Sequence, residues 1–205
     1  SEYGLDQFRY FLLREVPFGN DGDFSIISLK NRINADLAND LGNLVQRTLG
    51  FASKKNQGLL PGISEISSDG RIFFDSLQTE LNSYSQLMDE FKISQALDHL
   101  HTYLQLCNRF VDTQKPWELA KKNLELFAMF NRYMAQAIKS FAIASSPFLP
   151  DSTNRILKIL NDKKVDEQTN WKMTLLPNEL SSLELSAVKP LFPKIKTEME
   201  ASETP

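Results

Sequence analysis

The chain has 205 residues, of which 41% are hydrophobic and 24% charged, so it has the composition of a globular protein with a real core. Its net charge of −3, from 23 basic and 26 acidic residues, argues against a nonspecific nucleic-acid binder. No apolar run is long enough to cross a bilayer, and there is no signal-peptide pattern. The single cysteine, Cys107, excludes an internal disulfide and a cysteine-rich zinc site. The first residue is Ser1, which favours a processed product or a cut fragment.

Residues 5–16 are rich in apolar side chains and predict a short helix that ends before Pro17. Residues 18–23 contain glycines, an asparagine and aspartates, which is the composition of a turn. Three residues at helical spacing form the predicted apolar face of the helix: Phe8, Leu12 and Leu13. Three charged residues either contact another part of the protein or stay on the surface with an internal salt bridge: Asp6, Arg9 and Arg14.

The longest apolar stripe of the chain predicts a helix over residues 26–49. Its members recur at helical spacing: Ile26, Leu29, Ile33, Leu37, Leu41, Leu44 and Leu49. Ser25 is a suitable N-cap, and Phe24 and Leu29 occupy the two positions of a hydrophobic staple. Gly50 follows the last apolar position and suits a C-terminal stop.

A polar stripe runs along one flank of this predicted helix. Asn39, Asn43 and Arg47 follow one another at intervals of four residues, so they lie on one side of the helix. Amide and guanidinium groups one turn apart can offer hydrogen bonds to a base edge or a phosphate. A solvated helix face has the same spacing, so the pattern leaves both interpretations open.

The middle of the chain predicts antiparallel helices. A long polar connection over residues 52–71 precedes two helices, at 72–91 and 93–111, whose short link favours antiparallel packing. Pro116 suits the first turn of the next helix, and Trp117 follows it directly. An indole there either fills the core or projects from the corner where the helix begins.

The second half predicts a central helix followed by irregular chain. The broad apolar pattern of residues 124–143 indicates a helix at the centre of the bundle, ending before Pro147. Asp151 or Ser152 suits the cap of a further short helix. Residues 171–195 are apolar but interrupted by prolines, and predict an extended strap across the bundle. Its expected anchors are Trp171, Leu191 and Phe192.

No catalytic set is found in the sequence. His99 and His101 are two residues apart on a predicted helix, so they face different directions and do not form a metal pair. We expect them to be solvated or half-buried, and we expect no metal site. No glycine-rich phosphate loop is present.

Several motifs, taken together and in this order, resemble the class I methionyl-tRNA synthetases. They are residues 10–19 and 21–25, the run NADLANDLGNLVQR at 34–47, KPWELAK at 115–121, SPFLP at 146–150 and PLFPKI at 190–195. The resemblance covers nearly the whole chain. The Pro-Trp motif alone is weak, because other class I synthetases carry something similar.

The resemblance implies an all-α fold, an antiparallel helix bundle of the kind that binds the tRNA anticodon. Residues 1–24 are then a connector from the catalytic domain, residues 25–195 the anticodon-binding domain, and residues 196–205 a disordered tail. The two ATP-binding signatures of class I synthetases are missing, so this part alone is not catalytic. ATP and methionine are used by the catalytic domain of the intact ligase. The implied location is the cytoplasm or the mitochondrial matrix.

The resemblance also implies the site. In the family, the tryptophan of the Pro-Trp motif stacks on an anticodon base, which assigns that role to Trp117. Asn43 and Arg47 would then read base edges in the CAU anticodon of methionine tRNA, with the first anticodon base as the main determinant. Weaker candidates for phosphate contacts are Lys54, Lys55, Lys121 and Lys122.

Two alternatives stay open at this point. The first is the anticodon domain of another class I synthetase, for example one for a branched aliphatic amino acid, although the motif at 34–47 argues against it. The second is a helical protein-interaction module without an RNA role, which the acidic net charge favours slightly. Exposure of Trp117, and its protection by RNA, distinguishes this module from an anticodon-binding domain.

Overall fold

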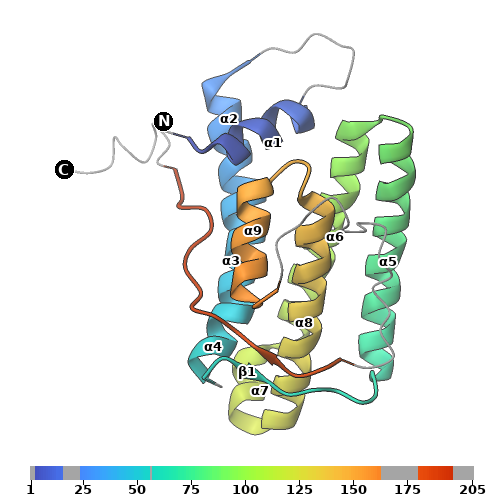
Figure 1. Ribbon diagram of the computed structural model, residues 1–205, viewed down its shortest axis with the longest axis vertical. Helices are drawn as coiled ribbons and strands as arrows, with labels where there is room; N and C mark the ends of the chain where they lie inside the picture. The colour runs from blue at the N-terminus through green and yellow to red at the C-terminus, as the bar shows by residue number, and fades with distance from the viewer. Residues whose placement is uncertain (1–2, 16–23, 56, 163–179, 196–205) are drawn as a thin grey trace, which may run out of the picture.

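A computed structural model of the chain describes residues 3–15, 24–55, 57–162 and 180–195. Within them the protein is a bundle of helices flanked by a small two-stranded ribbon, which confirms the predicted all-α class (Figure 1). No helix in these residues has both the length and the apolar character that crossing a membrane requires. The predicted turn at 18–23, the tail at 196–205 and the anchor Trp171 lie outside the described residues.

One continuous helical segment runs from Ile26 to Lys55, and we call it the long helix. Its parts are α2 (Ile26–Arg32), η1 (Ile33–Gly42), α3 (Asn43–Val45), η2 (Gln46–Gly50) and α4 (Phe51–Lys55), where η1 and η2 are wider π-helical turns. Ser25 caps it as predicted, because its Oγ accepts a hydrogen bond of 3.4 Å from the Ser28 amide. The apolar stripe is buried as predicted, except that Ile26 is 55% exposed.

The long helix does not end at Gly50, so that prediction is wrong. The next turn is held by packing, because Ala52 is fully buried and the Phe51 ring meets the Phe127 ring edge-on at 5.4 Å. A Cβ on Gly50 would lie 3.7 Å from the Val188 side chain. The glycine therefore sits where the helix packs closely against the C-terminal segment, and burial of the following turn outweighs its tendency to stop a helix.

The remaining helices follow the predicted order. They are α5 (Ser68–Asp89), α6 (Ile93–Gln114), α7 (Pro116–Lys122), α8 (Leu124–Ser145) and α9 (Pro150–Ile159). Helix α5 begins earlier than predicted because Ser67 caps it, accepting a bond of 3.1 Å from the Gly70 amide. Helix α6 runs on to Gln114, where Lys115 turns the chain with a left-handed φ of 48°. Pro116 then occupies the first turn of α7, as predicted.

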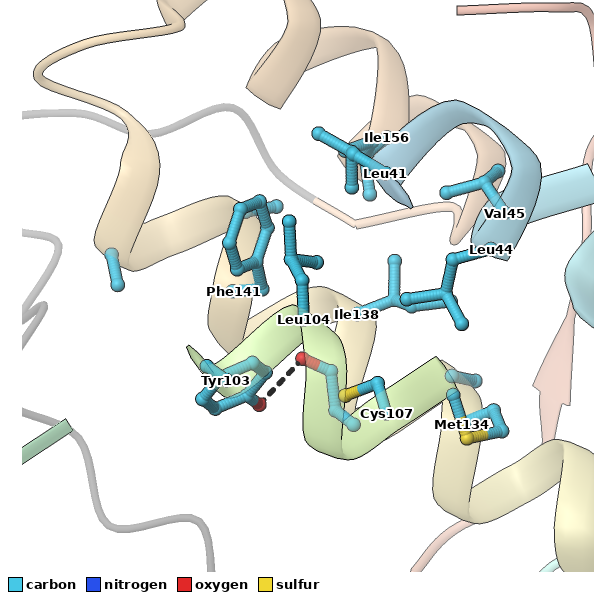
Figure 2. Packing of buried hydrophobic residues seen from close by; sticks show 14 of the residues in the cluster. Leu41, Leu44, Val45, Tyr103, Leu104, Cys107, Met134, Ile138, Phe141 and Ile156 are labelled. Carbon is cyan, nitrogen blue, oxygen red and sulfur yellow. Dashed lines mark hydrogen bonds between the residues drawn. The ribbon is translucent and has the colours of Figure 1, made fainter. Parts of the chain in front are cut away.

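The core lies where the long helix, α6, α8 and α9 meet, and α8 is central as predicted (Figure 2). Among its buried side chains are Leu41, Leu44, Leu104, Ile138, Phe141 and Ile156. The buried Tyr103 hydroxyl donates a 2.8 Å bond to the Ala137 carbonyl, so this polar group is satisfied. Burial raises the pKa of the Cys107 thiol far above its ordinary value, so this cysteine acts as a small core residue.

The C-terminal segment, residues 180–195, crosses the bundle as an extended strap, as predicted (Figure 1). Strand β2 (Leu183–Glu184) pairs antiparallel with β1 (Leu59–Leu60), and an isolated bridge joins Ile63 to Leu180. The predicted anchors Leu191 and Phe192 are 3% and 6% exposed. The strap is therefore a fixed part of the domain surface beside the long helix.

The first helix, α1 (Leu5–Glu15), buries a different face from the predicted one. Phe8 and Leu12 are 40% and 39% exposed, whereas Tyr10 and Phe11 are buried. Tyr10 has a specific partner, because its hydroxyl donates a 2.9 Å bond to the buried Asp36 of the long helix. Which face of α1 is buried therefore depends on the hydrogen bond between Tyr10 and Asp36 as well as on the number of apolar side chains.

The charged residues of α1 are mostly internal partners. Arg14 lies 2.5 Å from Asp98 on α6, which agrees with the internal salt bridge considered for this helix. Phe24 was predicted to staple the start of the long helix, and its ring is 54% exposed. Its ring centroid lies 6.0 Å from that of Phe8 and 5.9 Å from that of Phe11. These contacts fasten α1 to the bundle.

Asp6 caps α9, so the prediction that Asp151 or Ser152 does so is wrong, because both lie in the first turn of the helix. Leu149 is the N-cap residue of α9, and its side chain makes no capping hydrogen bond. Instead Asp6, which is 4% exposed, accepts bonds of 2.7 Å from the Ser152 amide and 3.4 Å from the Asp151 amide. A carboxylate at this end satisfies free N–H groups and interacts favourably with the helix dipole.

We expect Asp6→Ala to lower the free energy of unfolding by about 1–2 kcal/mol, because the start of α9 loses its acceptor in a buried place. Urea unfolding followed by circular dichroism measures the change. Asp6→Asn keeps one acceptor oxygen and should lose less. An alanine variant as stable as the parent protein would contradict the capping role.

Candidate nucleic-acid interface

The predicted polar stripe lies on the surface of the long helix. Asn39 and Asn43 are exposed, and Arg47 is half-buried. The stripe is therefore available to a ligand along two turns of the helix.

Arg47 has an acidic partner from another helix. Its Nη2 lies 2.6 Å from Oδ1 of Asp112 on α6. The Asp112 side chain is 63% exposed, so the pair contributes about 0–1 kcal/mol to stability, and its main effect is to orient the guanidinium. A guanidinium carries five N–H donors, so others remain for a ligand.

Trp117 lies beside Arg47. The indole is 43% exposed and projects from the start of α7. The guanidinium carbon of Arg47 is 5.7 Å from the ring centroid, within the range of a cation–π contact. Trp117 is thus neither buried in the core nor distant from the polar stripe, and Asn43 lies one helical turn before Arg47.

The four candidate lysines differ in their surroundings. Lys54 and Lys55 are exposed in the last turn of the long helix, and Lys121 is exposed on α7. Lys122 binds Glu118 one turn earlier, with its Nζ 3.0 Å from Oε2. The hydrogen bond from Lys122 lowers the pKa of Glu118 below its ordinary value. Lys122 is therefore a weaker candidate for a phosphate contact than the other three.

Two features of this surface were not found from the sequence. Asp112 is the partner of Arg47, and it also lines a polar hollow of about 480 Å³ with Asp40 and Arg109. The strap forms one wall of a second hollow, beside Asn39 and Asn43. No local sequence signal could reveal either, because both depend on which distant segments pack together.

One group of metal-ligand side chains occurs within the described residues, formed by Asp36, Asp40 and His101 with ligand atoms within 4.8 Å of one another. Asp36 already accepts a hydrogen bond from Tyr10, and its Oδ2 lies 3.6 Å from Arg32. These partners account for its buried charge, so the group supports no metal proposal.

The two histidines are partly buried, within the expected range. His99 Nδ1 lies 2.7 Å from Glu80 Oε2, and the His99 and His101 side chains are 36% and 23% exposed. His101 belongs to the group described above, and His99 does not.

Comparisons with known proteins agree with the fold. Residues 60–203 match the family described as the anticodon binding domain of methionyl tRNA ligase, and residues 1–49 match the class I tRNA synthetases of the methionine type. The chain is 35% identical over 195 residues to the methionine–tRNA ligase of Brucella suis biovar 1, covering 95% of this chain and 37% of that protein. It is 32% identical over 212 residues to the methionine–tRNA ligase of Fusobacterium nucleatum, covering 98% of this chain and 32% of that protein.

Solved structures give the same result. The apo methionyl-tRNA synthetase of Mycobacterium tuberculosis superposes with a TM-score of 0.82 at 29% identity, covering 95% of this chain and 39% of that one. The same enzyme in complex with methionyl-adenylate superposes with a TM-score of 0.81 at 31% identity, covering 93% of this chain and 38% of that one. The fold and the matched families define an anticodon-binding region of a class I aminoacyl-tRNA synthetase. The chain belongs to the methionyl-tRNA ligase family, and it spans about a third of the length of these relatives.

Proposed function

We propose that this chain binds the CAU anticodon of methionine tRNA and so allows the complete ligase to aminoacylate that tRNA. The observation that carries the proposal is the position of Arg47 over the exposed indole of Trp117, 5.7 Å from the ring centroid. A stacking surface and hydrogen-bond donors at one place are what an unpaired base requires.

The roles divide by chemistry. Trp117 offers a ring face on which a base of the anticodon loop stacks, an interaction that contributes about 1–3 kcal/mol per base. Asn43 and Arg47 read the edge of the first anticodon base, because an amide and a guanidinium offer directed hydrogen bonds. We assign the phosphates of the loop to the exposed lysines Lys54, Lys55 and Lys121, with Lys122 contributing less.

The opposite end of the molecule is proposed to meet the catalytic domain of the same ligase. Helices α1 and α2 lie at one end of the bundle and α7 lies at the other (Figure 1). Apolar side chains that are 39–69% exposed gather in α1, in α2 and in the residue before α2: Leu5, Phe8, Leu12, Phe24, Ile26 and Ile27. A surface of this kind is typical of an interface. It supports a contact between this end of the molecule and the catalytic domain.

Substrate activation belongs to that catalytic domain in this proposal. ATP and methionine are used there, and no residue of this chain is assigned a catalytic role. We place the ligase in the cytoplasm, supported by its similarity to bacterial ligases.

The two alternatives from the sequence fare differently. Membership of the methionyl-tRNA ligase family argues against a synthetase for a branched aliphatic amino acid. An exposed indole next to an arginine also suits a protein–protein interface, so this pair alone does not exclude a protein-interaction module without an RNA role. The RNA titration below distinguishes that module from the proposed function.

The test is a titration of the chain with an RNA hairpin that carries the CAU loop. We expect Trp117 fluorescence to be quenched as the hairpin binds, because the stacked base shields the exposed ring. The second tryptophan, Trp171, adds to the signal, so a Trp117→Phe variant is the control that assigns the quenching. No difference between the CAU hairpin and a hairpin with an unrelated loop would rule out the proposed function.

A further inference from the structure

The turn between α5 and α6 presents a phenylalanine, Phe91, to solvent. Among the large apolar side chains of the described residues it is the most exposed, at 72%. Its backbone has a left-handed φ of 58°. Bulky residues rarely adopt this conformation, and glycine or asparagine usually takes it at the end of a helix. The other non-glycine residues with left-handed φ in the described ranges are all polar: Gln57, Lys115 and Asn161.

Backbone hydrogen bonds at the end of α5 fix this turn. The Lys92 amide donates a 2.9 Å bond to the Leu87 carbonyl. The Phe91 amide donates a 3.1 Å bond to the Met88 carbonyl. This pair of bonds is the Schellman motif, which requires a left-handed residue at position 91. An ion pair of 2.7 Å between Lys92 Nζ and Glu90 Oε2 balances the charges on either side of the ring.

Contacts within the described part of the chain do not account for a phenylalanine in this turn. None of its ring pairs involves Phe91, and the residue does not pack against the hydrophobic core. A glycine would adopt the same φ without strain. A strained backbone that carries an exposed apolar ring therefore indicates a contact with another part of the protein.

The turn lies at the same end of the bundle as α1 and α2 (Figure 1). The end of α1 is joined to the start of α6, because Arg14 donates a 3.5 Å bond to the Ser94 carbonyl and pairs with Asp98. Ser94 is three residues after Phe91, so the turn lies next to the end of α1. The exposed apolar side chains of α1 and α2 are the ones proposed above to meet the catalytic domain. Phe91 extends that surface onto a second element.

We infer that the Phe91 ring inserts into an apolar pocket on the catalytic domain of the same ligase, as a second contact beside α1. An aromatic side chain that fills a pocket is typical of the residues that dominate an interface. The turn is fixed before docking, so little conformational freedom is lost when the ring inserts. The pocket is expected to be uncharged, because the flanking Glu90 and Lys92 already neutralise each other. The choice of partner rests on the proposed function.

The test compares the exposure of Phe91 in this chain and in the complete ligase. Hydroxyl-radical footprinting read by mass spectrometry gives the oxidation rate of each side chain. We expect Phe91 to be oxidised about fivefold more slowly in the complete ligase, because a docked ring is shielded from solvent. Ile72 is the matched control, since it is 66% exposed near the other end of α5 and should be oxidised at the same rate in both.

Two variants of this chain test whether the ring serves the chain itself. Phe91→Gly removes the ring and the backbone strain, so its unfolding temperature should equal or exceed that of the parent. Phe91→Ala removes the ring and keeps the strain, so it should unfold at a lower temperature than Phe91→Gly. A glycine variant that unfolds below the parent would show that the ring stabilises the chain, and would overturn the inference.

The remaining outcomes separate the possible partners of the ring. Equal oxidation of Phe91 in the chain and in the complete ligase would overturn the inference. Slower oxidation in this chain when methionine tRNA is added would assign the ring to RNA, and slower oxidation at higher protein concentration would assign it to a second copy. Either result would also overturn it. These measurements do not use the CAU hairpin, so the proposed function can fail while the position of Phe91 is still decided.

Discussion

Replacing Trp117 by alanine should weaken binding of the CAU hairpin by about tenfold or more. The expected size follows from base stacking on an aromatic ring, which is worth about 1–3 kcal/mol. The ring is 43% exposed and lies in the first turn of the short helix α7, so its removal should leave the core intact. Arg47 also loses its cation–π partner, an effect of about 0.5–1 kcal/mol at an exposed site.

The measurement is hairpin affinity by anisotropy, together with the unfolding temperature of each variant. Trp117→Phe keeps a smaller aromatic face and should bind with intermediate affinity. Leu124→Ala removes another exposed apolar side chain, 67% exposed at the start of α8, and should bind nearly as the parent does. A Trp117→Ala protein that unfolds, or one that binds RNA unchanged, would count against the stacking role.

The second large effect is on discrimination between RNAs. Arg47→Gln should weaken the CAU hairpin far more than it weakens a hairpin with an altered anticodon. A guanidinium that reads a base edge contributes about 1–3 kcal/mol of discrimination, whereas one that touches only phosphate contributes equally to every sequence. Comparing the two hairpins at one salt concentration measures the difference, because phosphate contacts depend strongly on salt.

The ion pair between Arg47 and Asp112 calls for a control. Arg47→Gln removes the reading group and also breaks this 2.6 Å contact. Asp112→Ala breaks the contact while keeping the arginine, so it should reduce binding of the CAU hairpin less than Arg47→Gln does. Equal losses for both hairpins with Arg47→Gln would mean that the arginine meets only phosphate.

Much of the local structure follows from the sequence. The apolar period of the long helix predicts its buried side from Leu29 to Leu49, and the Ser25 cap forms as expected. Pro116 opens a helix because a residue without an N–H fits the first turn. The same period places Asn43 and Arg47 on one flank. These features depend on residues close together in the chain.

Other features contradict local signals because burial decides them. The long helix continues through Gly50 because Phe51 and Ala52 pack into the protein. Helix α1 turns Tyr10 inward and leaves Phe8 exposed, since Tyr10 has a hydrogen-bond partner on the long helix. Partners of this kind lie tens of residues away, so periodicity within one helix cannot identify them.

The sequence by itself determined which segments become helices, which side of each long helix turns inward, and which motifs resemble the ligase family. Only the tertiary structure decided that Arg47 meets Trp117 and Asp112, that Asp6 caps α9, and that the strap walls a groove beside Asn43. The physical reason is that the side-chain period is a property of one element. The pairing of distant elements depends instead on how all their surfaces pack together around one core.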